Sequence, residues 1–172
     1  MEIAVRLGSF VGVFALLAFL EYVAPRRERP MGRKPRWFGN LAIVAMNTAV
    51  VRLAFPLVAV GAAVAAQQRG WGLFNNVNVP SPVAFMLAVV LLDFVVYLQH
   101  VVLHAVPLLW RVHRMHHGDR DLDVTSGLRF HPLEIVLSML IKMAAVLLIG
   151  PSVLAVITFE VLLNATSMFV RL

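Results

Sequence analysis

All six histidines of this 172-residue chain lie between His100 and His131. Within that stretch, a first motif HxxxH is followed by a second, HxxHH, and the five histidines of the two motifs are His100, His104, His113, His116 and His117. Residues three or four apart lie on one face of an α-helix, so each motif would present its imidazoles together. Neutral imidazole is the commonest metal ligand among protein side chains. The spacing therefore predicts a metal centre built from these five residues, with no catalytic group beyond it.

The chain contains no cysteine, which excludes zinc fingers, iron–sulfur clusters and thiolate chemistry. A single histidine at a membrane edge is more often an interfacial or hydrogen-bonded core residue than a ligand. Five together would repel one another when protonated unless a cation held them, which favours metal binding for the cluster. His131, in the sequence RFHPLE, remains open as a ligand, as a group that orients a ligand, or as a turn residue before Pro132.

The composition is that of a membrane protein. Hydrophobic residues make up 60% and charged residues 14% of the chain, and the mean hydropathy is +0.85. The net charge of +6 comes from basic residues in segments beside apolar runs, so we expect a membrane surface and not nucleic acid as the anionic partner. We therefore predict an all-α, multi-span membrane protein with a single domain over residues 1–172.

Four to five apolar helices would carry the histidines. The expected spans are residues 7–23, 41–66, 82–104, 133–149 and 153–172, with Arg6 snorkelling at the first and Pro56 kinking the second. A proline-rich segment, residues 25–37, carries six Lys/Arg and reads as a cytoplasmic loop. Alternation of the spans then places the histidine motifs on the cytoplasmic side and the N-terminus on the opposite side.

On the third span, the polar residues Asp93, Tyr97, His100 and His104 form one stripe along a helix face. A carboxylate within a membrane is expected to face the bundle interior and to have a partner. The stripe could be a polar seam between helices. We favour an arrangement in which Asp93 and Tyr97 support the metal site or contribute to it, because the stripe ends in two histidines.

Two ion pairs are expected at mid-membrane depth. Arg52 lies twelve residues beyond Asn40, and Asp93 lies eleven residues before His104, which places both roughly 16–18 Å from the same edge. Lys142 and Glu160 flank the break at Gly150-Pro151 at similar distances along the chain. Because an unpaired charge at the centre of a span costs about 2.5–3.5 kcal/mol, we predict the contacts Arg52–Asp93 and Lys142–Glu160, with snorkelling of the two cations as the alternative.

The sequences DFVVYLQHVVLH and LWRVHRMHHGDRDLDVTSGLRFHPLE resemble the fatty acid hydroxylase/sterol desaturase superfamily of integral membrane proteins. That family has an Asp and a Tyr ahead of HxxxH, then LWRxHxxHH, an acidic loop and RFHPxE. The matching residues here are Asp93, Tyr97, His100, His104, Leu109, Trp110, Arg111, His113, His116, His117, Arg129, His131, Pro132 and Glu134.

The resemblance implies a lipid hydroxylase or desaturase that acts on a fatty acyl or sterol-like substrate. It further implies a non-haem diiron centre, O2 as co-substrate, and electrons from a reductase or a cytochrome b5-like or ferredoxin-like carrier. His131, Asp93, Tyr97 and Glu134 are further candidates as ligands or as groups that orient them. Family members continue to another HxxHH near the C-terminus, which is not present before Leu172, so we expect an incomplete domain or a reduced site with little activity on its own.

Two alternatives remain at this stage. The first is a zinc- or haem-binding membrane protein, although the zinc motif HExxH is missing and a bis-histidine haem does not need HxxHH. The second is a non-catalytic membrane scaffold that retains the histidine motifs. Iron content and O2 consumption distinguish the oxygenase from the first, and an effect that survives removal of the histidines would indicate the second.

Overall fold

The computed structural model describes residues 2–25, 33–55, 58–119 and 121–169, and within these ranges it is helical without strands. The helices are α1 (Glu2–Val23), α2 (Arg33–Ala54), α3 (Ala59–Arg69), α4 (Leu73–Asn76), α5 (Ser81–Ala105), α6 (Pro107–His117), the 3₁₀ turn η1 (Ser126–Leu128), α7 (Pro132–Ile149) and α8 (Val153–Phe169). The all-α prediction is confirmed.

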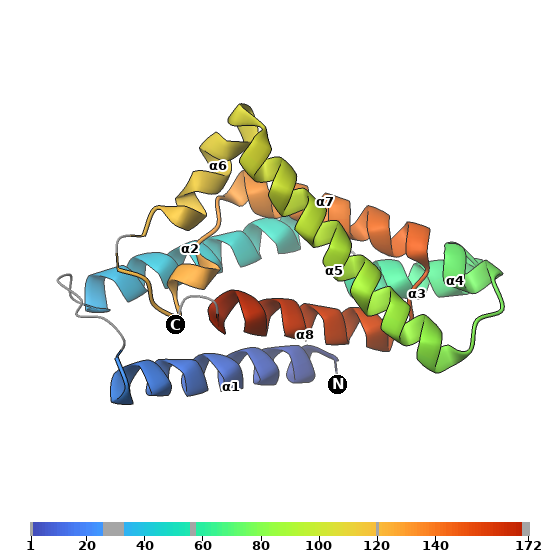
Figure 1. Cartoon of the computed structure of the whole chain (residues 1–172), viewed down its shortest axis with the longest axis horizontal. Helices are drawn as coiled ribbons and strands as arrows, with labels where there is room; N and C mark the ends of the chain where they lie inside the picture. Colours follow the sequence, from blue (N-terminus) through green and yellow to red (C-terminus); the bar gives the residue numbers. More distant parts are fainter. Residues whose placement is uncertain (1, 26–32, 56–57, 120, 170–172) are drawn as a thin grey trace.

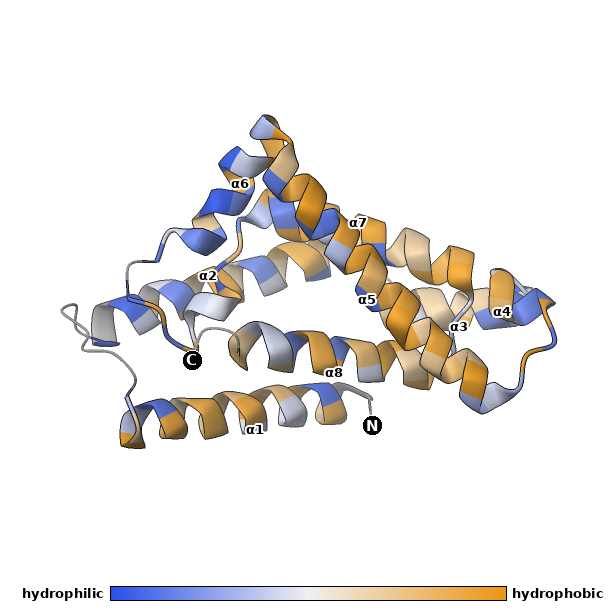
Figure 2. Ribbon diagram, in the orientation of Figure 1, coloured by the Kyte–Doolittle hydropathy of each residue, from blue (hydrophilic) through white to orange (hydrophobic). Residues whose placement is uncertain are grey.

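Four segments are long and apolar enough to cross a membrane: Ala4–Val23, Arg36–Asn76, Ser81–Ala105 and Pro132–Ile149. A shorter apolar helix, Val153–Phe169, follows them. Apolar residues cover most of α1, α5, α7 and α8, whereas α6 is largely hydrophilic (Figure 2). A span needs roughly 20 predominantly apolar residues. These segments therefore indicate an integral membrane protein, as the composition predicted.

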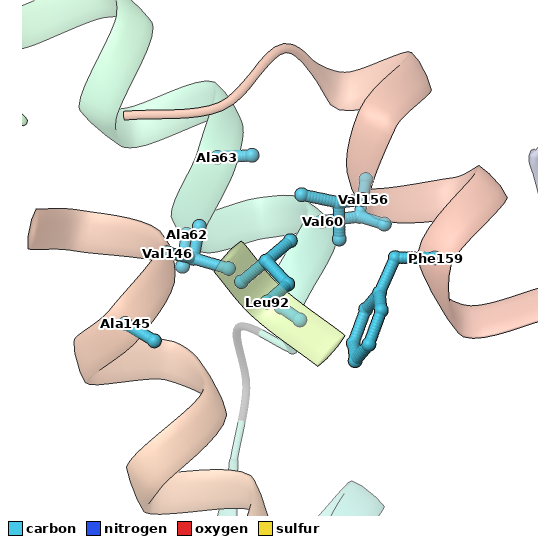
Figure 3. Close-up of a cluster of buried hydrophobic side chains, with 9 residues drawn as sticks. Val60, Ala62, Ala63, Leu92, Ala145, Val146, Val156 and Phe159 are labelled. Atoms are coloured by element: carbon cyan, nitrogen blue, oxygen red, sulfur yellow. The ribbon is translucent and has the colours of Figure 1, made fainter. Parts of the chain in front are cut away.

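The helices pack in two pairs with α5 across them. α1 lies along α8, and α2 with α3 lies along α7, while α5 contacts α6, α7 and α8 (Figure 1). The main core joins α3, α5, α7 and α8 through small and branched side chains around Leu92 and Phe159, each about 1% exposed (Figure 3). Small residues such as Ala63 and Ala145 let the helix backbones approach closely, which is the usual basis of helix packing in membranes.

The expected second span is divided in two. α2 ends at Ala54 and α3 begins at Ala59, with Val58 extended between them. Pro56, the expected kink, lies outside the described residues. The expected basic loop is also shorter than predicted, because α2 already begins at Arg33 and includes Pro35 in its first turn, where proline is tolerated. Arg26, Arg27 and Arg29 lie outside the described residues.

The remaining boundaries agree closely with the sequence. α5 covers the third span, and α7 and α8 are separated at Gly150, which adopts the left-handed conformation (φ 66°) typical of a helix C-cap. The segment AVPLLWRV, between the two histidine motifs, is mostly helical. Only Val106 separates α5 from α6, because Pro107 begins the new helix at its first position.

Glu160 lies at the centre of a buried charge cluster. Its carboxylate is 3.2 Å from Lys142 Nζ and 2.9 Å from Arg6 Nη2, and the Glu160 side chain is 4% exposed. The predicted contact between Lys142 and Glu160 is thus present. Arg6 was expected to snorkel but instead pairs with Glu160, which links α1, α7 and α8.

The predicted contact between Arg52 and Asp93 is wrong. Both side chains are exposed, and neither forms an ion pair in the described part of the chain. The two residues lie at similar distances from one membrane edge in sequence, but this depth does not determine which helices are neighbours. α2 packs against α7, and α5 packs mainly against α6, α7 and α8.

The acidic loop, residues 119–125, attaches the segment after α6 to α2. Arg36 Nη2 lies 3.1 Å from Asp119 and 3.0 Å from Asp123, with all three side chains at most 8% exposed. Asn40 donates to Thr125 Oγ1 at 2.9 Å, and Glu21 accepts the Val124 amide at 2.8 Å. Asp119 and Asp123 thus anchor the loop through buried ion pairs with Arg36. They are structural residues that hold η1 and the following chain in place.

This loop should be acid-sensitive. Burial raises the pKa of the Asp119 carboxyl, but the Ser126 hydroxyl, the Arg36 charge and Asn40 together outweigh it and hold the pKa below the usual 3.8. A lowered folded-state pKa means that this stabilisation is complete above pH 3.8 and is lost as the pH falls through the folded pKa. We expect the melting temperature to fall on acidification below pH 4 and the fall to be smaller in Asp119→Asn. Thermal melts between pH 3 and 7 test this, with Asp93→Asn, an exposed carboxylate outside the loop, expected to follow wild type.

Candidate metal centre

Four histidines converge where α6 folds back against the end of α5. Ligand nitrogens of His100, His104, His113 and His117 all lie within 4.8 Å of one another. The Nε2 atoms of His100 and His104 are 3.1 Å apart, and those of His113 and His117 are also 3.1 Å apart. Each pair is spaced i, i+4 on its helix. The turn at Val106, between α5 and α6, brings the two pairs together.

Glu134 orients one of these rings. His113 is fully buried, and its Nδ1 lies 2.7 Å from Glu134 Oε1, itself on the first turn of α7 and 3% exposed. Donation of Nδ1–H to the carboxylate leaves the Nε2 lone pair directed toward the cluster. A carboxylate behind a ligating histidine fixes the tautomer and raises the basicity of the metal-binding nitrogen. The sequence named Glu134 only as a further candidate, and the structure shows which histidine it contacts.

His116 does not join the four. Its ring stacks on Phe130 at 4.3 Å between centroids and 11° between planes, and it is 7% exposed. Successive helical residues are rotated by about 100°, so His116 and His117 project from opposite sides of the His113 direction. The cluster lies on the His117 side. The expectation that all five histidines converge is therefore met by four.

The other candidates lie away from the cluster. His131 caps α7, where its Nδ1 accepts a hydrogen bond from the Leu133 amide at 3.2 Å, and it is not a member of the group of four. Asp93 and Tyr97 lie on the exposed face of α5, and Tyr97 is 59% exposed and stacks on Phe94. The prediction that this stripe faces the bundle interior is wrong, because α5 buries the face that carries Ala88, Leu92 and Leu103.

An aromatic side chain that was expected only as part of the family pattern also borders the cluster. The Trp110 ring lies 5.0 Å from the His104 ring and 5.8 Å from the His117 ring, which places an aromatic wall beside two of the four histidines. Trp110 stands three residues before His113, so the i, i+3 spacing on α6 is the signal that could have indicated it.

The four nitrogens fit a single metal ion. Imidazole nitrogens bind such ions at about 2.1 Å, so two ligands of one ion lie about 3.0 Å apart at an octahedral angle and about 3.4 Å apart at a tetrahedral angle, and the two separations of 3.1 Å are close to these values. Nitrogen donors without sulfur suit Fe, Cu, Ni or Zn better than Mg or Ca. A second ion would need donors that the described residues do not bring to this cluster.

The fold and this site define a helical membrane protein with a histidine cluster between two consecutive helices. The profile of the fatty acid hydroxylase family matches residues 85–171, which include all six histidines, and the chain belongs to that family. It is also 33% identical over 88 residues to the human (Homo sapiens) alkylglycerol monooxygenase, an alignment that covers 50% of this chain and 20% of that protein. The chain thus spans about a fifth of the length of that relative. No solved structure matches the chain.

Proposed function

We propose that this chain provides the iron site of an O2-dependent lipid hydroxylase. The observation that carries the proposal is the convergence of four imidazoles within 4.8 Å, inside the segment that matches the fatty acid hydroxylase family. Apolar spans around the cluster support a membrane lipid as substrate. The matched human relative is named as a monooxygenase of alkylglycerols, which supports insertion of one oxygen atom as the reaction class.

In the proposed site, His100, His104, His113 and His117 hold the ion, and Glu134 keeps His113 in the ligating tautomer. Iron, when bound, supplies the activation of O2 for attack on a C–H bond. The overall reaction converts lipid–H, O2, two electrons and two protons into lipid–OH and water. Four donors satisfy one ion, so the diiron centre implied by the family resemblance requires further ligands.

The electrons are proposed to come from an external carrier on the cytoplasmic side. Arg111 and Arg114 are exposed on α6, the helix that carries two of the four ligands. Exposed cations beside a redox site attract acidic partners and raise their association rate. A cytochrome b5-like or ferredoxin-like carrier, or a reductase, fits this surface.

The test is an assay of the purified whole chain in detergent, loaded with iron and supplied with a reductase, a ferredoxin and lipid under ¹⁸O2. Because the four donors satisfy only one ion, we expect a low yield of hydroxylated lipid, each molecule of which carries one ¹⁸O atom. Label entering only from H2¹⁸O, or O2 consumption that is the same without protein-bound iron, would contradict the proposal. Zinc in place of iron in protein purified from iron-rich medium would favour the zinc alternative.

Glu134 is expected to raise metal affinity through His113. Glu134→Gln keeps an acceptor oxygen of similar size but removes the charge, and Glu134→Leu removes both. Loss of such an outer carboxylate typically lowers metal affinity about 10–100-fold, so we expect about 10-fold for Gln and a larger loss for Leu. Competition with a chelator measures this. Equal affinity in wild type and both variants would show that Glu134 has only a structural role.

A further inference from the structure

A cavity lies between the α1–α8 pair and the α2–α7 pair, and none of the histidines lines it. Its volume is about 570 Å³, within the range of small-molecule binding sites. Most of its walls are apolar, and they include Phe10, Val51, Ile135 and Met139. Walls of this kind are suited to a hydrocarbon chain.

Arg52 brings to this cavity a positive charge that has no counter-charge among the described residues. It lines the cavity near the end of α2, and it forms no ion pair or hydrogen bond in the parts of the chain that the structure describes. Arg6, the other cation of the lining, contacts Glu160, which Lys142 also contacts. Among the described residues, Glu160 is thus engaged by Arg6 and Lys142, while Arg52 contacts no carboxylate. An ionisable residue within a span is by default a functional site, and the partner that this one lacks is an anion.

The cavity also has a polar end near the metal centre. Asn47 lines it five residues before Arg52, roughly 7.5 Å away along the helix axis. Its Nδ2 donates to the Phe130 carbonyl at 2.8 Å. Its Oδ1 has no hydrogen-bond partner in the described part of the chain, although the residue is only 6% exposed. Phe130 lines the cavity as well, and its ring stacks on His116, whose ring is 5.7 Å from that of His113.

We propose that this cavity binds an acyl lipid with an anionic headgroup, the headgroup at Arg52 and the chain running along α2 toward Phe130. Guanidinium pairs well with carboxylate and with phosphate, so a fatty acid and a lysophospholipid share the required chemistry. The inference rests on the proposed function in taking this lipid as the substrate class. Binding itself requires neither metal nor O2.

The experiment measures binding to the purified, metal-free whole chain in non-ionic detergent, by displacement of a fluorescent fatty acid and by thermal shift. The probes are palmitate, 1-acyl lysophosphatidate and the neutral hexadecanol. Palmitate or lysophosphatidate should bind and raise the melting temperature. Hexadecanol should bind at least about tenfold more weakly, because it cannot make a charge-assisted contact with the guanidinium. The stronger of the two acids identifies carboxylate or phosphate as the preferred headgroup.

Arg52→Gln should lower the affinity for the anionic lipid at least about tenfold, and Arg52→Lys should retain part of it. Without lipid, Arg52→Gln should melt no lower than wild type, because Arg52 has no hydrogen-bond or ion-pair partner among the described residues. Arg69→Gln, which removes an exposed arginine that stacks on Trp71, should bind as wild type.

Equal binding of hexadecanol, binding of neither acid, or an unchanged affinity in Arg52→Gln would overturn the inference. Should Arg52→Gln be unstable, Arg52→Lys and Arg69→Gln serve in its place. The inference is then overturned if these two variants bind the anionic lipids no better than an unrelated membrane protein does. Arg52-dependent binding without hydroxylation would refute the proposed function alone. Hydroxylation of a neutral lipid at the same rate by wild type and Arg52→Gln would refute this inference alone.

Discussion

Replacing His104 with alanine is expected to abolish both bound iron and product formation. His104 supplies one of four nitrogens that lie within 4.8 Å, and removal of one leaves three donors for the ion. Even outer-sphere partners are worth about 10–100-fold in metal affinity, so loss of a direct ligand should cost more than roughly 100-fold. Iron per protein by mass spectrometry and hydroxylated lipid by chromatography measure the two effects.

The matched control is His131→Asn. It removes an imidazole outside the cluster and keeps an acceptor at the N-cap of α7, where asparagine is favoured. We expect iron content near that of wild type in this variant and unchanged membrane insertion in both. Retention of iron and activity in His104→Ala would show that the cluster is not the metal site.

Replacing Glu160 with glutamine is expected to cause the largest loss of stability. The carboxylate is buried between Arg6 and Lys142, and its removal leaves both cations without their shared counter-charge. Breaking a buried ion pair by removing one partner typically costs about 3–5 kcal/mol. Reversible unfolding in mixed detergent, followed by circular dichroism, measures the change in the free energy of unfolding.

A double-mutant cycle with Lys142 separates this effect from simple loss of packing. Lys142→Gln should cost less in the Glu160→Gln background than in wild type, with a coupling energy of about 0.5–3 kcal/mol. Additive costs would contradict the pairing. Arg52→Gln provides a contrast, because a cation that pairs with none of the described residues should be removable without this penalty.

The spans could be predicted because hydropathy and length depend on local sequence. The break at Gly150-Pro151 has the same basis, since a left-handed C-cap favours glycine and proline cannot continue a helix. The division between α2 and α3 was expected only as a kink. The start of α6 at Pro107 could not be predicted, because a proline beside a helical run is equally compatible with the end of one helix and the beginning of another.

Ion pairs could be predicted only where the chain itself fixes the register. Lys142 and Glu160 flank one tight turn at similar distances, so their levels follow from the sequence. Arg52 and Asp93 share a depth but lie on helices with different neighbours, and nothing local determines which helices pack together. For the same reason Arg6, far away in sequence, was not recognised as a partner of Glu160.

The candidate metal centre was predictable in its residue types but not in its membership. Spacing places His113, His116 and His117 on neighbouring faces of α6, and only the packing of α6 against α5 and α7 selects His113 and His117. Glu134 becomes interpretable only once α7 brings its carboxylate to His113 Nδ1. Asp93 and Tyr97 fall on the stripe of His100 and His104, but α6 covers only the end of it.

Iron K-edge X-ray absorption on the whole chain purified with iron tests the four-histidine metal centre most directly. We expect a first shell dominated by nitrogen at about 2.1 Å, with the outer-shell scattering of several imidazoles. This signal should be lost in His104→Ala and retained in His131→Asn. A spectrum with oxygen ligands and one imidazole or none, or one that is identical in His104→Ala, would contradict it.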